Sequence, residues 1–494
     1  MSAYDRVIQG ATLFDGTGAP GRRADLAIRG DRIAAIEPAI EASGAARVEA
    51  SGLALAPGFL DVHTHDDFAA VLMPEMGFKV QGGVTSVVVG NCGMGAAPWH
   101  QACGYAAAFH PGQALPQWDG YAGYLAHLDA APASCNVAAL VGLGAVRAAV
   151  LGGEARAPSD GELDAMRAIV REGVEAGCVG VSSGLIYEPG KHAQLAELAA
   201  LAAEAHANGG LYATHMRDEG AGLLDSVREA IAIGERAGVP IQISQHKAAG
   251  RESWGLVRET LALIDAARAR GVDVLADQYP YTAASTVLAA VVSYFAANGS
   301  GVGRGDPNDV VLSSAPKNPD WEGRSIASLA AQWAVEPLAA AQRVLDAEGI
   351  SATVVIHSMC EDDVRTVMRH PSTMIGSDGL PMLHGKPHPR LYGTFARVLG
   401  TYVREQGVLP LEAAIHRMTG MSAQRFGLAD RGLLRVGAFA DVVLFDPATI
   451  ADVATYADPH HPPAGIARVF VNGTEVVRDG AHTGARPGRS LRKH

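Results

Sequence analysis

The sequence has few cysteines, few aromatic residues and no long apolar run. Its 494 residues include five cysteines, an odd number without paired spacing, so no disulfide framework is indicated. Unpaired cysteines are typical of a reducing compartment, and we expect a cytoplasmic protein. No window is long and apolar enough to span a bilayer, and the first residues lack the pattern of a secretory signal. We therefore expect no membrane partner.

An excess of basic residues is also missing. The net charge is -12, which argues against a nucleic-acid partner, because such partners require a clustered basic face. Only residues 484–494, GARPGRSLRKH, are locally basic, and we expect them to form a solvated terminus. The oligomeric state cannot be inferred from such patterns.

Both ends of the chain are rich in short segments that alternate apolar and polar residues. Such segments, separated by Gly and Asp, predict small antiparallel strands. They are DRVIQGATLFDG, ADLAIRGDRIAAIEP and ARVEASGLALAPG near the start, and GAFADVVLFDP and IARVFVNGTEVVRDG near the end. Since chain termini often lie close together, we expect one β domain built from residues 1–57 and 430–494.

Residues 58–429 alternate short apolar runs with helical segments. DGELDAMRAIVREGVEAG and AGLLDSVREAIAIGERAG carry apolar residues at helical spacing and end in Gly, as a capped helix does. Repeated strand and helix predict a parallel sheet, and about eight units indicate a (β/α)₈ TIM barrel in the α/β class. The candidate strands are GFLDVH, TSVVVG, NVAALVG, CVGVSSG, LYATH, IQISQH, VDVLADQY, ATVVIH and STMIGSD.

Nine candidate strands are one too many for this barrel. Roughly 70 residues separate VLADQYPY from ATVVIH, far more than one crossover helix needs. We therefore expect an insertion at about 286–350, containing GSGVGRGDPN and placed over the barrel mouth, with ATVVIH as its return strand.

Polar side chains follow many of the predicted strands at their carboxyl ends, which converge on one face of a barrel. His63 and His65 are two residues apart and point the same way on a strand, so they could bind one ion. Imidazole, thiolate and carboxylate together favour zinc over magnesium or calcium. The predicted metal ligands are His63, His65, Cys92, His215, His246 and Asp378.

Asp378 follows the last strand and is the predicted proton carrier. A zinc ion lowers the pKa of water and polarises a carbonyl, while a carboxylate takes and returns the proton. The SDG tripeptide around Asp378 is also good turn chemistry, so a turn-capping role is the alternative.

Taken in order, eight motifs make the chain similar to a known family. The chain resembles the D-aminoacylase (N-acyl-D-amino-acid deacylase) branch of the amidohydrolase superfamily over nearly its whole length. The resemblance implies an amidohydrolase-type barrel with a small β-sandwich domain. The motifs are GFLDVHTHDD, GNCGMG, SSGLIYEPG, ATHMRDEG, SQHK, DQYPY, GSDGLP and HPRLYGTF.

The resemblance also implies roles for individual residues. One tightly bound Zn²⁺ is expected at Cys92, His215 and His246, and a second is possible at His63, His65 and Asp378, with Cys92 shared. No lysine lies within the CVGVSSGLIYEPG segment, so Cys92 is expected to replace the carboxylated lysine of many amidohydrolases. Tyr187 is expected at the substrate carbonyl. The expected contacts of the substrate carboxylate are Lys247, Tyr279, Ser285 and Arg390.

The chain departs from the family pattern in GSDGLPMLHGKPHPR, where the family commonly has GSDGLPHD before HPR. The apolar segment TVLAAVVSYF, after Ser285, lacks the arginine that would select an acidic side chain. It could be plain helix core, but we favour a hydrophobic D-amino acid as the substrate side chain.

Together these features predict a small-molecule enzyme, a zinc-dependent hydrolase that releases a carboxylate and a free D-amino acid from N-acyl-D-amino acids. Stereochemistry follows from the resemblance alone. The alternatives are a D-dipeptidase, a hydrolase of cyclic amides such as hydantoins, and a non-catalytic metal-binding protein.

Overall fold

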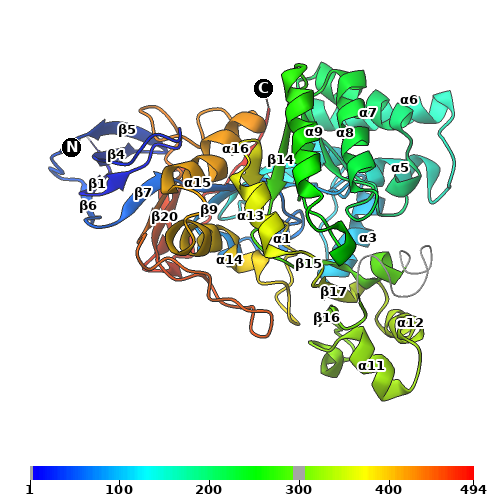
Figure 1. Ribbon diagram of the computed structural model, residues 1–494. Coiled ribbons are helices and arrows are strands. Elements are labelled where there is room, and N and C mark those ends of the chain that lie inside the picture. Colours follow the sequence, from blue (N-terminus) through cyan, green and yellow to red (C-terminus); the bar gives the residue numbers. More distant parts are fainter. Residues whose placement is uncertain (1–3, 293–305, 494) are drawn as a thin grey trace.

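The computed structural model describes residues 4–292 and 306–493 and contains a nearly closed parallel barrel (Figure 1). Neighbouring strands pair in chain order, and a bridge between Thr64 and Gly379 joins the last strand region to the first. The barrel strands are β8 (Phe59–Asp61), β9 (Val84–Val89), β10 (Asn136–Gly142), β11 (Gly180–Gly184), β12 (Leu211–His215), β13 (Ile241–Ile243), β14 (Val274–Gln278) and β18 (Thr373–Ile375).

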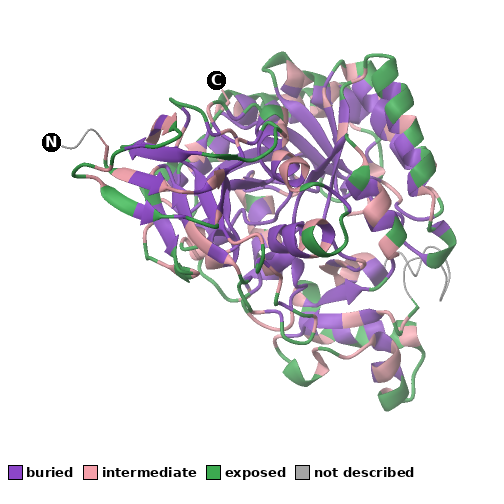
Figure 2. Cartoon of the chain, turned by 60° about the vertical axis from the view of Figure 1, so that its left-hand side comes forward, coloured by how far each residue is buried: buried purple, intermediate pink, exposed green. Residues whose placement is uncertain are grey.

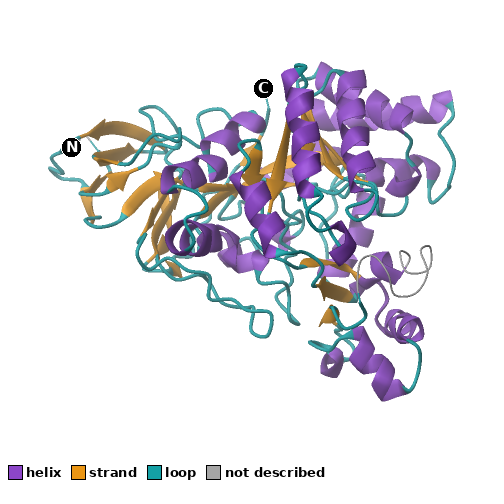
Figure 3. Cartoon of the chain, in the orientation of Figure 1, coloured by secondary structure: helices purple, strands orange, loops and turns teal. Residues whose placement is uncertain are grey.

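Helices cover the outside of the barrel, as the sequence pattern predicts (Figure 3). Ser159 and Glu162 form a reciprocal capping box at the start of the sixth helix, and Gly238 ends the eighth in a left-handed conformation. The outer helices are α5 (Leu143–Leu151), α6 (Asp160–Glu175), α7 (Leu195–Ala207), α8 (Leu223–Ala237), α9 (Val257–Ala269), α13 (Glu361–Arg369) and α15 (Leu411–Met418).

Shorter or less regular helices complete the connections. They are α1 (Ala69–Leu72), α2 (Gly77–Val80), α3 (Trp99–Phe109), α4 (Gly120–Ala130), α14 (Arg390–Arg397) and α16 (Gly420–Arg425), with a π-helical segment at Val398–Glu405. No helix of the described residues has both the length and the apolar character needed to cross a membrane.

The described part of the segment from β15 to β17 forms a separate lobe, at the lower right of Figure 1. Its strands β15 (Ala284–Val287), β16 (Val310–Ser314) and β17 (Thr353–Ile356) pair antiparallel, and α11 (Ile326–Trp333) and α12 (Pro337–Glu348) pack on them. ATVVIH is therefore the return strand of the insertion, which leaves eight strands for the barrel. Parts of GSGVGRGDPN and TVLAAVVSYF fall at 293–305, outside the described residues.

Two further sheets lie at the left of Figure 1; one is built from N-terminal strands alone and the other from strands of both chain ends. One has the order β5-β4-β1-β6 and the other β22-β21-β20-β19-β7-β2-β3. Apolar side chains of both sheets form one buried cluster, and many residues of these strands are coloured as buried in Figure 2. The strands are β1 (Arg6–Gln9), β2 (Thr12–Leu13), β3 (Arg22–Arg23), β4 (Asp25–Arg29), β5 (Arg32–Glu37), β6 (Ala46–Glu49), β7 (Ala54–Pro57), β19 (Val442–Phe445), β20 (Ile466–Val471), β21 (Thr474–Arg478) and β22 (Ala481–His482).

The basic tail differs from the expectation of a solvated terminus. Its strand β23 (Ser490–Leu491) pairs parallel with β10 of the barrel, and Leu491 is buried. Arg492 also pairs with Asp129 at 2.5 Å. A two-residue strand has too little pattern to be recognised in a sequence, and the exact domain boundaries stay a prediction.

Candidate active site

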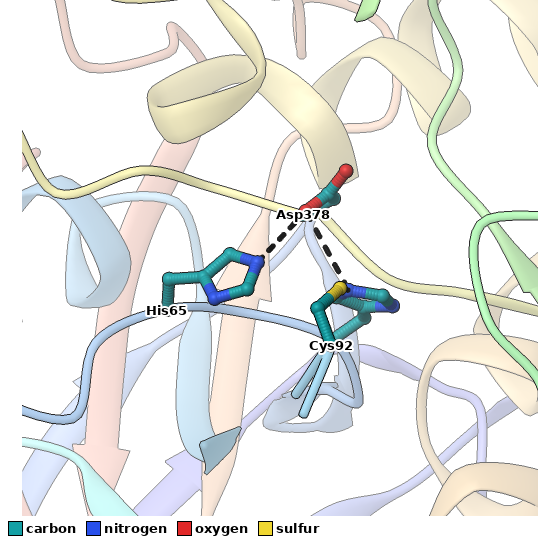
Figure 4. A group of neighbouring side chains, drawn as sticks. His65, Cys92 and Asp378 are labelled. Atoms are coloured by element: carbon teal, nitrogen blue, oxygen red, sulfur yellow. Dashed lines mark hydrogen bonds and ion pairs between the residues drawn. The ribbon is translucent and has the colours of Figure 1, made fainter. Parts of the chain in front are cut away.

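Four of the predicted ligands meet at the carboxyl ends of the barrel strands. The ligand atoms of His63, His65, Cys92 and Asp378 all lie within 4.8 Å of one another, and all four residues are buried. Asp378 Oδ1 lies 3.2 Å from His65 Nε2 (Figure 4) and 3.5 Å from His63 Nε2. The Cys92 sulfur is 3.4 Å from His63 Nε2. We call these residues the four-residue cluster.

An unusual backbone conformation directs the side chains of two members of the four-residue cluster. Cys92 has φ 56° and Asp378 has φ 49°, in the left-handed region that non-glycine residues rarely adopt. Such strain persists only where the surrounding structure holds it, and it is frequent at functional sites. Here the Asp378 amide donates to the His63 carbonyl at 2.7 Å, which ties the two strand ends together.

The charges of the four-residue cluster depend strongly on one another. Burial lowers the pKa of His65, but hydrogen bonds to Asp378 and Cys92 outweigh it and raise the pKa to about 9. Burial raises the pKa of the Cys92 thiol, but His63 and His215 hold it well below its usual range. A thiolate and a carboxylate thus require positive charge around them, which a cation bound by these donors also provides.

Asp277 orients His63 from behind, and the sequence analysis missed it. Its Oδ1 lies 3.1 Å from His63 Nδ1, so the Nε2 side of the ring faces the four-residue cluster. The same carboxylate accepts a hydrogen bond from the backbone N–H of Gln245 at 2.7 Å and another from the side-chain amide of Gln242 at 2.8 Å. The position of Asp277 at the end of a predicted strand, in the DQYPY motif, could have indicated that it belongs to the site.

The predicted position of Cys92, His215 and His246 is assembled only in part. His215 Nδ1 lies 3.5 Å from the Cys92 sulfur. The His246 ring instead pairs through Nε2 with the Thr260 hydroxyl of α9 at 2.8 Å. The side-chain amide of Gln245 approaches both His215 and Cys92. The sequence analysis did not predict Gln245 as a site residue.

Arg390 lies directly beside the four-residue cluster. Its Nη2 is 3.0 Å from Asp378 Oδ2 and donates to the Ser285 carbonyl at 3.2 Å. The guanidinium also stacks on Tyr279, 4.5 Å from the ring centre. Nε and Nη1 of Arg390 and the Ser285 hydroxyl are buried without a hydrogen-bond partner among the described residues. These three donor groups are of the kind that pair with a carboxylate.

Lys247 and Tyr187 are both connected to His215, by different contacts. Lys247 Nζ pairs with Glu219 at 2.6 Å, and Glu219 also approaches His215 Nε2 at 3.5 Å. The Tyr187 hydroxyl lies 3.2 Å from Thr286 in the insertion, and its ring packs edge-on against His215. Burial raises the pKa of Tyr187 well above its ordinary value, so the hydroxyl stays a donor.

A buried charge network supports the loop that carries Asp378. Lys79 Nζ contacts Asp61 at 2.6 Å and the Ser377 hydroxyl at 2.9 Å. Asp61 accepts from the Ser377 amide at 2.8 Å. Lys79 also lies 3.4 Å from Asp66. The first strand end and the last are thus joined by a lysine that the sequence analysis did not single out.

One wall beside the four-residue cluster is apolar. Phe109, Leu380 and Met382 form a buried cluster with Ala108, and Met94 and Val287 pack against it. The Phe109 ring lies 6.4 Å from the His65 ring, measured between centres. The segment GSDGLPMLHGKPHPR therefore contributes two apolar side chains to this wall, and one of them, Met382, lies where the chain departs from the family pattern.

Comparisons with known proteins agree with this architecture. The chain matches a model described as the amidohydrolase family over residues 46–477. It is 43% identical over 493 residues to the D-aminoacylase of Alcaligenes xylosoxydans xylosoxydans, covering 99% of this chain and 97% of that protein. N-acyl-D-glutamate deacylase from the same organism is 44% identical over 490 residues, covering 99% and 96%.

A solved structure shows the same fold over the full length. It is N-acyl-D-glutamate deacylase from Bordetella bronchiseptica, complexed with zinc and a phosphonate inhibitor that mimics the tetrahedral intermediate. The TM-score is 0.88 at 41% identity, with 100% of both chains covered. The chain therefore belongs to the amidohydrolase family, in the group that includes D-aminoacylase and N-acyl-D-glutamate deacylase.

Proposed function

We propose that this protein hydrolyses the amide bond of N-acyl-D-amino acids, giving a carboxylate and a free D-amino acid, in a zinc-dependent reaction. The observation that carries the proposal is the buried guanidinium of Arg390. It places donors that have no partner in the described part of the chain beside the four-residue cluster, so a substrate carboxylate and a scissile amide can be bound side by side. The activities of the two relatives support the substrate class.

The residues present fit a zinc ion. Imidazole nitrogen, thiolate sulfur and carboxylate oxygen are its usual ligands, and all three kinds converge in the four-residue cluster. Cys92 and His215 lie at the neighbouring position where, with His246, the resemblance places the tightly bound ion. Zinc bound here supplies a Lewis acid that polarises the amide carbonyl and lowers the pKa of water.

The two oxygens of Asp378 allow it to serve two tasks. Oδ1 faces His63 and His65, while Oδ2 faces Arg390. In the proposed reaction this carboxylate takes a proton from the attacking water as the C–O bond forms. It returns the proton to the leaving nitrogen as the C–N bond breaks, so that the product amine leaves neutral.

Tyr187 and Arg390 position the substrate around Asp378. The protonated Tyr187 hydroxyl donates to the carbonyl oxygen as negative charge develops on it. Arg390 binds the α-carboxylate through its free N–H groups, with the Ser285 hydroxyl as a further donor and Tyr279 supporting the guanidinium. A carboxylate anchored in this way holds the amide in one orientation, which lowers the entropic part of the barrier.

We further propose a hydrophobic substrate side chain. Phe109, Leu380 and Met382 form the apolar wall next to His65 and offer no charged partner to an acidic group. The test is a panel of N-acetyl-D- and N-acetyl-L-amino acids assayed with added zinc. Release of amine from D-leucine, D-methionine or D-phenylalanine derivatives is expected, and no release from any D-derivative would refute the function.

The same arrangement weighs against the alternatives. A hydantoin ring has no free carboxylate, so it would leave the buried donors of Arg390 without a partner. A dipeptide with a D-residue at its carboxyl end keeps that carboxylate, and including such dipeptides in the panel separates the two activities. All five cysteines are free, which fits the cytoplasmic location we propose.

A further inference from the structure

His388 is a buried histidine that lies two residues before Arg390, in the segment HPRLYGTF. Its ring makes hydrogen bonds to two backbone groups. Nδ1 accepts from the backbone N–H of Arg390 at 3.0 Å, and Nε2 donates to the Ala283 carbonyl at 2.9 Å. His388 therefore links the start of α14, where Arg390 is the first residue, to the chain directly before β15.

The backbone N–H of Arg390 needs an acceptor from outside its helix, because the first N–H groups of an α-helix have no partner within it. Serine, threonine, asparagine or aspartate often supplies this acceptor from the N-cap position. Here the N-cap residue is Pro389, whose side chain has no acceptor atom. The His388 imidazole takes its place, and so fixes the point at which the Arg390 side chain leaves the backbone.

The Arg390 side chain is tied to the same chain segment as the His388 ring. Its Nη2 donates to the Ser285 carbonyl at 3.2 Å, two residues beyond the Ala283 carbonyl that His388 contacts. The Ser285 hydroxyl, which is a proposed donor to the substrate carboxylate, belongs to this segment too. His388 therefore helps to hold two carboxylate donors, the Arg390 guanidinium and the Ser285 hydroxyl, in a fixed relation to each other.

Three tyrosine rings surround the His388 imidazole. Tyr281 and Tyr456 each lie edge-on to it with 5.0 Å between ring centres, and Tyr279 lies at 6.3 Å. Tyr456 comes from the connection between β19 and β20, and its hydroxyl lies 3.4 Å from His388 Nε2. Tyr279 also carries the Arg390 guanidinium on its face. This packing restricts rotation of the imidazole, so its two backbone hydrogen bonds are held in place.

The protonation state of His388 suits both hydrogen bonds. Burial, with a further contribution from the charge of Arg390, holds the pKa of His388 well below its usual range. The ring is therefore neutral, with one nitrogen that accepts and one N–H that donates. A protonated ring could not accept from the Arg390 N–H.

We propose that His388 is a positioning residue for substrate binding, which fixes the backbone from which Arg390 reaches the substrate carboxylate. The proposal rests on the proposed function, since His388 acts here only through the carboxylate contact of Arg390. His388 does not itself touch the reacting amide in this scheme. Its loss should therefore weaken binding of the carboxylate more than it slows the chemical step, which separates its role from that of a catalytic residue.

The test is the steady-state kinetics of zinc-loaded His388 variants with the best N-acetyl-D-amino acid of the substrate panel. His388→Leu removes both hydrogen bonds, so KM is expected to rise roughly tenfold while kcat changes little. In His388→Asn the side-chain oxygen can still accept from the Arg390 N–H, so the rise in KM is expected to be smaller. His460→Asn is the matched control, because the His460 ring bonds the Gly385 carbonyl and the Tyr392 hydroxyl instead.

A double-mutant cycle shows whether His388 acts through Arg390. In the Arg390→Gln background, His388→Leu is expected to change KM by less than about twofold, because the side chain that it positions is already gone. The same rise in KM in both backgrounds would overturn the proposal, and so would a wild-type KM in folded His388→Leu. Where His388→Leu does not fold, His388→Asn replaces it in the cycle, and a wild-type KM in that variant has the same meaning.

Crystal structures of the variants separate failure of this proposal from failure of the proposed function. In His388→Leu, or in His388→Asn where the first does not fold, the Arg390 guanidinium is expected to lose its 3.2 Å contact with the Ser285 carbonyl. A guanidinium that keeps this contact would overturn the proposal even in an enzyme that hydrolyses N-acyl-D-amino acids. A protein that releases no amine from any of these substrates would refute the proposed function, while a displaced guanidinium would still show that His388 positions Arg390.

Discussion

Arg390 and Asp378 form a buried ion pair in which Nη2 lies 3.0 Å from Oδ2, while two further nitrogens of the guanidinium have no hydrogen-bond partner within residues 4–292 and 306–493. One arginine thus contacts the proposed base and the proposed substrate carboxylate. Burial raises the pKa of Asp378, but Arg390, His63 and His65 outweigh it and hold the pKa well below its usual range. Substrate binding and the charge of the base are therefore coupled through a single side chain.

Replacing Arg390 tests this coupling. Arg390→Gln removes charged hydrogen bonds to the carboxylate, so kcat/KM for N-acetyl-D-amino acids is expected to fall roughly 10- to 100-fold, mainly through KM. It also removes a group that lowers the pKa of Asp378, so the acidic limb of the pH profile is expected to move to higher pH. Steady-state kinetics between pH 5 and pH 9 measure both effects, and an unchanged KM would contradict the carboxylate-binding role.

Asp378→Asn tests the proton carrier. The amide keeps the shape of the side chain but cannot take a proton from water, so kcat is expected to fall by on the order of 10²- to 10⁴-fold. Because Asp378 is also a metal-site residue, zinc content is measured in the same preparation. Asp452→Asn, which breaks the 3.0 Å pair with Arg397, is the matched control. If folded, zinc-loaded Asp378→Asn turned over substrate as fast as wild type, Asp378 would not be the proton carrier.

Tyr187→Phe tests the carbonyl contact. The Phe ring keeps the packing against His215 and loses only the hydroxyl, which lies 3.2 Å from Thr286. Loss of one donor to a developing oxyanion is expected to lower kcat by about 10²- to 10³-fold with little change in KM. Tyr392→Phe, which removes the contact with His460, is the control. Equal kinetics for the two variants would argue against the role of Tyr187.

Much of the fold is visible in the sequence because apolar strands and capped helices repeat along the barrel. The four-residue cluster also follows from pattern, since His63, His65, Cys92 and Asp378 all come directly after predicted strands. The contact of the His246 ring with Thr260 does not follow from pattern, because it depends on the left-handed backbone of Gln245, which Asp277 stabilises from another strand. A two-residue strand such as β23 is similarly defined by its partner alone.

The role of Lys79 in supporting the loop of Asp378 was likewise not visible in the sequence. Replacing Lys79 tests its contribution to stability. In the wild type, Lys79 Nζ lies 2.6 Å from the Asp61 carboxylate and 3.4 Å from the Asp66 carboxylate. Lys79→Met would leave both buried carboxylates without this positive charge. Breaking one partner of a buried pair costs about 3–5 kcal/mol in the free energy of unfolding. Thermal unfolding of Lys79→Met is expected to show a clearly lower midpoint. The double change Lys79→Met with Asp61→Asn should recover part of the loss.

His110 predicts a specific dependence of stability on pH. Burial, with a smaller contribution from His384, lowers the pKa of His110 to about 4, against about 6.5 in an unfolded chain. Between these values the unfolded chain binds the proton and the folded chain does not, so stability is complete above about pH 6.5 and falls as the pH is lowered toward 4. The loss is on the order of 3 kcal/mol, because one pKa unit corresponds to about 1.4 kcal/mol.

His110→Gln should remove this part of the fall, which thermal unfolding midpoints from pH 7.5 to pH 4 would show. His461→Gln, at a side chain that is 49% exposed, controls for the loss of an imidazole. Parallel midpoint curves for wild type and His110→Gln would mean that this imidazole gains its proton in the folded chain as readily as in the unfolded one.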